Sequence, residues 1–208
     1  EALALSAGRT MLDRLVFLEA DVRRQGAWLV ACAGAVGAQS DCGEALLYAV
    51  DGIGRLGPAG RVQLLAGEAD ALDSIGGAPF PRLEPGASVL LTRGASGQES
   101  RLFLVHRPDG PRGDSVALVA RVSRSYFWVG NDSESLPAGV ELALWDSESG
   151  SLPGFVGEAL QLSDDVASRM KHDGSGAFEW RGRTERFSAA FWSFPETHRF
   201  HLPPWHVV

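Results

Sequence analysis

Residues 5–30 read LSAGRTMLDRLVFLEADVRRQGAWLV and carry the pattern of one long helix. Four of the apolar residues follow the spacing i, i+4, i+7 and i+11: Met11, Leu15, Leu18 and Val22. This spacing places them on one helical face, and the charged residues lie mostly off that face. The pattern extends to about residue 36, a helix of roughly 50 Å. A helix of this length is expected to span more than one packing unit.

After this helix, the chain is predicted to form a second, shorter helix and then β-strands. Ser40 or Asp41 can cap a helix over residues 43–56, which Gly57-Pro58 ends. Residues 62–66 read as a short strand and residues 70–75 as a helical turn. Three further runs, joined by stretches rich in turn residues, predict an antiparallel meander: residues 88–92, 101–107 and 115–123.

The same order of elements then begins again after a linker at residues 123–139. A strand over residues 140–145 precedes a helix over residues 160–169. Three more strands follow, at residues 176–181, 184–194 and 205–208. Each set of about 80 residues is near the lower size for a stable core, so the long helix is expected to cover both. The predicted divisions are the helix at 1–39, one unit at 40–128 and a second unit at 129–208.

This organisation resembles the double Cache domain, in which two PAS-like units of antiparallel sheet share one long N-terminal helix. The first two stretches that carry the resemblance are the helix quoted above and the meander RLFLVHRPDGPRGDSVALVARVSRSYF, residues 101–127. The other two are VELALWDSESGSL, residues 140–152, and the closing segment from GAFEW at 176–180 to PPWHVV at 203–208. The resemblance implies an α/β fold of the α+β type, with two PAS-like sheet units on the N-terminal helix.

Double Cache domains are extracytoplasmic sensors of bacterial transmembrane proteins. The resemblance therefore implies the ligand-sensing domain of a membrane-anchored signal transducer of the diguanylate cyclase or histidine kinase type. It implies a periplasmic location, flanking transmembrane helices, a homodimer formed through the long helix, and an unknown small molecule bound in the membrane-distal unit at 40–128. The alternative is a periplasmic protein-interaction domain that binds no small molecule.

Composition and chain ends agree with an extracytoplasmic domain cut from a longer protein. The net charge of −7 argues against a nucleic-acid partner and against adhesion to anionic lipid. The longest uncharged apolar run, residues 27–38, is too short to cross a bilayer. Both ends of the chain fall within predicted elements, which indicates that further segments flank this domain.

The sequence contains no coherent set of catalytic residues, so no enzymatic activity, cofactor or metal is predicted for it. GIGRLG at residues 52–57 matches a dinucleotide motif, but a predicted helix precedes it where a strand is required. A secreted hydrolase is disfavoured because no nucleophile elbow is present. The histidines near the C-terminus are expected to be solvated residues of a surface loop: His198, His201 and His206.

The candidate ligand-binding residues follow the first meander: Arg93, Arg101, Phe103, His106, Tyr126 and Trp128. Strand alternation puts Arg101 and Phe103 on one face and His106 on the other. Among these six residues, the two arginines and the histidine are the polar candidates for an anionic ligand, unless they are simply exposed hairpin residues. The two aromatic residues after the meander could close the base of a pocket or plug the seam between the units.

Two further sequence features bear on the ligand and on redox state. The Arg-x-Trp motif of the amino-acid-binding Cache domains is absent, because Arg61-Val62-Gln63 lacks the tryptophan. An α-amino-acid ligand is therefore not expected. Cys32 and Cys42 could form a disulfide in an oxidising compartment or remain two buried thiols.

Overall fold

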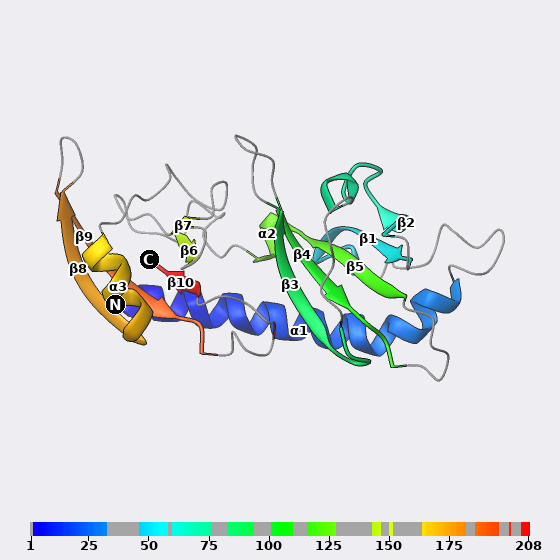
Figure 1. Ribbon diagram of the computed structural model, residues 1–208, viewed down its shortest axis with the longest axis horizontal. Helices are drawn as coiled ribbons and strands as arrows, with labels where there is room; N and C mark the ends of the chain where they lie inside the picture. The colour runs from blue at the N-terminus through cyan, green and yellow to red at the C-terminus, as the bar shows by residue number, and fades with distance from the viewer. Residues whose placement is uncertain are drawn as a thin grey trace. The chain divides into compact units, whose positions relative to one another are not determined.

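The computed structural model describes residues 2–32, 46–57, 60–75, 83–93, 101–109, 116–127, 143–146, 150–151, 164–181, 186–195, 200 and 205–208. The chain divides into two compact units. Unit A consists of Arg14–Phe127, and unit B consists of Glu1–Asp13 together with Trp128–Val208. Each unit holds one sheet, and both are drawn in Figure 1.

Helix α1, Ala2–Cys32, confirms the long N-terminal helix. The predicted stripe is the buried face of this helix, because Met11, Leu15, Leu18 and Val22 are all buried. Residues up to Asp13 belong to unit B, and those from Arg14 onward belong to unit A. One continuous apolar stripe therefore supplies buried side chains to both units.

Sheet A belongs to unit A and has the strand order β2-β1-β5-β4-β3, with every neighbouring pair antiparallel. Its strands are β1 (Val50–Leu56), β2 (Val62–Gly67), β3 (Ser88–Arg93), β4 (Arg101–His106) and β5 (Ala117–Val122). The last three strands are the predicted meander, which is confirmed. A short 3-10 helix, η2 (Asp73–Ile75), follows β2 and confirms the predicted helical turn. Helix α2 (Arg124–Phe127) directly follows β5.

Sheet B belongs to unit B and repeats this arrangement with the order β7-β6-β10-β9-β8, again antiparallel throughout. Its strands are β6 (Leu144–Asp146), β7 (Gly150–Ser151), β8 (Ser175–Arg181), β9 (Arg186–Ser193) and β10 (Trp205–Val207). Helix α3 (Asp164–His172) precedes β8 and lies beside it in Figure 1. When the strands are counted within each unit, the two orders are the same. This repetition confirms the predicted α+β fold of two antiparallel sheets and an N-terminal helix.

The predicted helix over residues 43–56 is wrong from Val50 onward, because residues 50–56 form strand β1. Two glycines explain the difference. A Cβ on Gly52 would lie 2.6 Å from Cβ of Ala71, and one on Gly54 would lie 2.6 Å from Cδ1 of Leu72. Residues with side chains would therefore push the η2 segment off the sheet. The glycines allow a close packing of β1 that local helix signals do not reveal.

The two faces of sheet A have different partners. The η2 face carries an apolar cluster in which Val89, Phe103, Val105 and Val119 pack against Ala71, Leu72 and Ile75. Figure 1 shows α1 on the opposite face, which we call the α1 face. Contact with this face is close, because a Cβ added to Gly26 would lie 3.6 Å from Cδ1 of Leu118. Side chains on β4 alternate between the two faces, as the sequence predicted.

Candidate functional site

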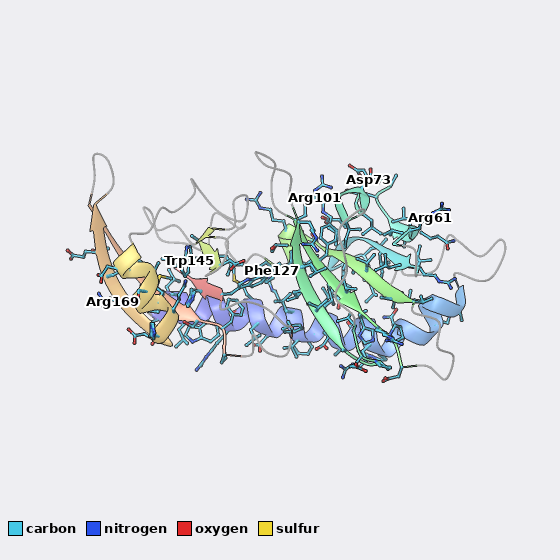
Figure 2. The ribbon with its side chains drawn as sticks, in the orientation of Figure 1. Arg61, Asp73, Arg101, Phe127, Trp145 and Arg169 are labelled. Carbon is cyan, nitrogen blue, oxygen red and sulfur yellow. The ribbon has the colours of Figure 1, made fainter. Side chains whose placement is uncertain are left out.

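The candidate site lies on the η2 face of sheet A, where an apolar floor ends in a group of arginines. Phe103 is fully buried in the centre of this floor. Two residues before it on β4, Arg101 is half-buried and points to the same face. Figure 2 shows Arg101 and Asp73 of η2 on the side of sheet A away from α1. Asp73 itself is exposed.

Strand register brings three arginines together at this end of the floor. Arg93 on β3 is directly opposite Arg101 on β4. Arg121 on β5 is directly opposite Phe103, and is therefore a diagonal neighbour of Arg101. Directly opposed Cβ atoms lie about 5 Å apart and diagonal ones about 7–8 Å apart. The three guanidinium groups can therefore reach one small molecule.

A β-bulge places a single carboxylate beside these arginines. The register between β1 and β5 shifts between Val50 and Gly52, so Asp51 is the extra residue on β1. Its Oδ2 accepts an ion-pair contact from Nε of Arg121 at 3.0 Å. Gly67 supports the bulge with φ of 101°, and a Cβ there would lie 2.5 Å from Cα of Gly52. The bulge therefore fixes the orientation of Arg121.

The charge and hydrogen-bond balance of this group suits an anion. The described strands of sheet A bring three arginines together here with one carboxylate, Asp51, which is paired with Arg121. Nε of Arg93 is buried and has no hydrogen-bond partner within the described residues. A buried cationic donor without a partner is costly, and a carboxylate is the group that guanidinium binds best. The arrangement can bind and orient an anionic group, but it offers no nucleophile paired with a base.

His106, a predicted ligand residue, is on the α1 face and does not join the arginines. It is 1% exposed, and its Nδ1 lies 3.0 Å from Oγ of Ser88, its partner across the sheet. Burial lowers the pKa of His106, and the charge of Arg23 lowers it further, while Glu19 opposes both. His106 is therefore a neutral residue packed between the sheet and α1.

Tyr126, a second predicted ligand residue, also contacts α1. Its hydroxyl donates to the backbone oxygen of Arg14 at 3.0 Å, and Nη1 of Arg14 donates to the backbone oxygen of Tyr126. The Tyr126 ring packs edge-on against Tyr48 with centroids 5.6 Å apart. Burial raises the pKa of Tyr126, while the Arg14 charge lowers it. These contacts attach α2 to α1 on the side away from the arginines.

The remaining predicted residues divide between the floor and the undescribed part of the chain. Phe103 forms the floor beneath Arg101. Trp128 lies outside the described residues, and so does Cys42, so the Cys32–Cys42 bridge stays a prediction. His198 and His201 are also outside the described residues.

The sequence analysis missed two members of the site, Arg121 and Asp51. Arg121 could have been found, since it is the only charged residue in the predicted strand at 115–123 and lies two positions after Val119. Asp51 could not, because it fell within the predicted helix over residues 43–56. Its role depends on the pairing of β1 with a strand about seventy residues away in the sequence.

The prediction that His206 is solvated in a surface loop is wrong. His206 lies within strand β10 at the centre of sheet B and is 1% exposed. Within the described ranges, no group of three or more His, Cys, Asp or Glu side chains is arranged to hold a metal ion. No helix among those ranges is both long and apolar enough to cross a membrane.

Comparison with known proteins identifies the fold. No family model and no curated protein matches the chain. Among solved structures, an extracellular ligand binding receptor from Desulfohalobium retbaense is 12% identical with a TM-score of 0.57, and the match covers 97% of this chain. This chain spans only 37% of that receptor's length.

A second solved structure matches over nearly its whole length. It is the extracellular domain of a protein described as a histidine kinase, rpHK1S-Z16, with 13% identity, a TM-score of 0.56 and coverage of 99% of this chain and 88% of that one. At these identities the likeness shows the fold. That fold is the helix-and-two-sheet architecture that the double Cache resemblance implied.

Proposed function

We propose that this chain is the extracytoplasmic ligand-sensing domain of a membrane-anchored signal transducer, of the histidine kinase or diguanylate cyclase type. In this proposal unit A is membrane-distal and unit B is membrane-proximal, close to the predicted divisions at 40–128 and 129–208. The fold supports the proposal, since both similar structures are extracellular domains and one is described as ligand binding. The domain itself catalyses no reaction.

The observation that carries the proposal is the set of three arginines at the end of the apolar floor in unit A. Two of them, Arg93 and Arg101, are cross-strand partners, and Arg121 is held by its ion pair with Asp51. Like charges placed opposite one another destabilise a sheet unless something compensates for them. A bound anion would compensate, so the proposed ligand is a small molecule with a carboxylate at one end and an apolar body that covers Phe103.

The contacts of unit A suggest how binding would reach α1. Arg121 is on β5, and only two residues separate it from α2. The paired hydrogen bonds between Tyr126 and Arg14 then join α2 to α1. A ligand that favours one position of β5 would shift the balance between two arrangements of α2 against the helix. Signal transmission along α1 follows from this coupling.

A thermal-denaturation screen with matched ligand pairs tests the proposed ligand chemistry. Each carboxylate in the panel is compared with its uncharged amide, for example succinate with succinamide and benzoate with benzamide. Binding to the native state raises the melting temperature, and we expect a rise with at least one acid that its amide does not reproduce. If no acid stabilises the domain more than its amide, the anionic site is refuted.

We further propose that the domain is a homodimer formed through α1. The exposed side of this helix carries Phe17 and Trp28, which are 69% and 49% exposed. They are eleven residues apart, or about three turns, and so share one face. Large exposed aromatic residues on one face are typical of interaction sites. Light scattering is expected to show a dimer that Phe17→Glu dissociates; a wild-type monomer at high concentration would contradict this.

A further inference from the structure

Unit B contains a buried histidine that contacts two aromatic rings and has one ring nitrogen without a partner among the described residues. His206 is on β10, the central strand of sheet B, between β6 and β9. It faces the side of the sheet that α3 covers, since its ring contacts Trp145 and Phe191. Those two residues form an apolar cluster with Val166 and Met170 of α3, and we call this side the α3 face. The other side of sheet B faces α1, because Trp192 contacts Gly8.

Hydrogen bonds in unit B fix which nitrogen of His206 carries the proton. Oγ of Ser193 donates its single hydrogen to the backbone oxygen of Asp173 at 3.0 Å. The same Oγ lies 2.7 Å from Nδ1 of His206. Because a hydroxyl has only one hydrogen to donate, Nδ1 must be the donor in this second bond. The neutral ring then carries its lone pair on Nε2.

This Nε2 atom is buried and makes no hydrogen bond with any residue that the structure describes. Buried polar atoms almost always have a partner, so this acceptor is open to a donor that the described residues do not supply. Burial is the main cause that lowers the pKa of His206 to about 4. The charge of Asp146 raises this pKa and the charge of Lys171 lowers it, both by less than burial does. The ring is therefore neutral at ordinary pH, and Nε2 can only accept.

The two rings beside His206 define the shape of the partner. The Trp145 centroid lies 5.2 Å from that of His206 with an interplanar angle of 42°, and the Phe191 centroid lies 6.1 Å away at 73°. Both side chains are buried. Aromatic walls at these angles favour a flat, apolar body, in contrast to the cationic end of the site in unit A.

We propose that the α3 face of unit B is a second small-molecule site, where Nε2 of His206 accepts a hydrogen bond from an uncharged planar molecule bearing an O–H or N–H donor. This site is independent of the anion site in unit A, and neither proposal requires the other. A domain with both sites would respond to two chemically different ligands, one through its arginines and the other through a neutral histidine.

The test uses phenol as the probe and toluene as its match, because the two molecules have nearly the same shape and only phenol donates. Nitrogen NMR of histidine-labelled protein follows each ring nitrogen separately, and the spectrum of His206→Phe assigns the signals. We expect phenol at millimolar concentration to shift the Nε2 signal of His206 and to bind roughly tenfold more tightly than toluene. His206→Phe should abolish that preference.

His106 is the matched control, since it also bonds to a serine across the sheet and also has a buried Nε2 without a partner within the described ranges. It lies on the α1 face of unit A, so phenol should leave its signals in place. Equal affinity for phenol and toluene, an unmoved His206 signal, or a shift at His106 alone would overturn the proposal. The wild-type spectra decide these outcomes even if His206→Phe does not fold.

Discussion

Replacing either of two glycines in α1 with alanine should change stability in opposite directions. Alanine is favoured over glycine within a helix by about 1 kcal/mol, and this gain applies equally at Gly8 and Gly26. At Gly26 the new Cβ would lie 3.4 Å from Cγ of Pro108, which is an ordinary van der Waals contact. Gly26→Ala should therefore stabilise the domain by roughly 0.5–1 kcal/mol.

At Gly8 the same methyl group has no room. Its position falls against the Trp192 ring, only 2.5 Å from Cζ3. Overpacking of this kind typically costs about 1–3 kcal/mol, which offsets or exceeds the gain in helix propensity. The net effect is a loss of roughly 0–2 kcal/mol, so the two variants should differ by about 1–3 kcal/mol.

Urea denaturation followed by the fluorescence of the six tryptophans measures this difference in the free energy of unfolding. The two variants share the chemical change and the helix, so Gly26→Ala is the internal reference for Gly8→Ala. If Gly8→Ala stabilises the domain as much as Gly26→Ala does, then α1 does not pack against sheet B in the way described here.

Three further outcomes follow from the structure. The unfolded-state pKa of histidine is about 6.5 and that of His206 in the fold is about 4. The contribution of His206 to stability should therefore be nearly constant above pH 6.5 and fall as the pH drops toward 4. Between pH 7.5 and 4.5 the free energy of unfolding should fall by roughly 2 kcal/mol because of His206, after a discount for solvent screening. Urea titrations at these two pH values should show that His206→Phe loses less stability than the wild type. An equal loss in both proteins would contradict the lowered pKa of His206. Gly67→Ala should lower the free energy of unfolding by about 1–3 kcal/mol, and by more than Gly60→Ala does. Both glycines have positive φ, but only Gly67 lies against the bulge at Asp51. Equal denaturation midpoints for the two variants would refute this. Tyr126→Phe should lose about 1 kcal/mol by removing the bond to Arg14, and unchanged stability would show that α2 is not held to α1 by this hydroxyl.

The sequence predicted the elements whose signals are local. The apolar spacing in residues 5–30 defines α1, and turn-rich stretches on both sides of 101–107 define the meander. Strand alternation also placed Phe103 and His106 on opposite faces correctly. These features depend on neighbouring residues, and so they can be predicted without knowledge of the tertiary structure.

The missed features depend on contacts between distant parts of the chain. Strand β1 was predicted as helix because its glycines are explained only by Ala71 and Leu72 across the sheet. Asp51 joins the site through a bulge that exists only when β1 pairs with β5. His206 is buried because the sheet order puts β10 in the centre, which the sequence of its final strand does not reveal.

Isothermal titration of the strongest carboxylate ligand into three proteins tests the central claim most directly: wild type, Arg101→Gln and Arg61→Gln. Arg101 is mutated instead of Arg121 because the ion pair between Asp51 and Arg121 then remains intact. Arg61 is an exposed control just before β2. A charge-assisted hydrogen bond is worth about 1.5–3 kcal/mol, so Arg101→Gln should weaken binding by at least roughly tenfold, while Arg61→Gln should change it less than about twofold. Equal affinity in all three proteins would contradict an anion site on the η2 face of sheet A.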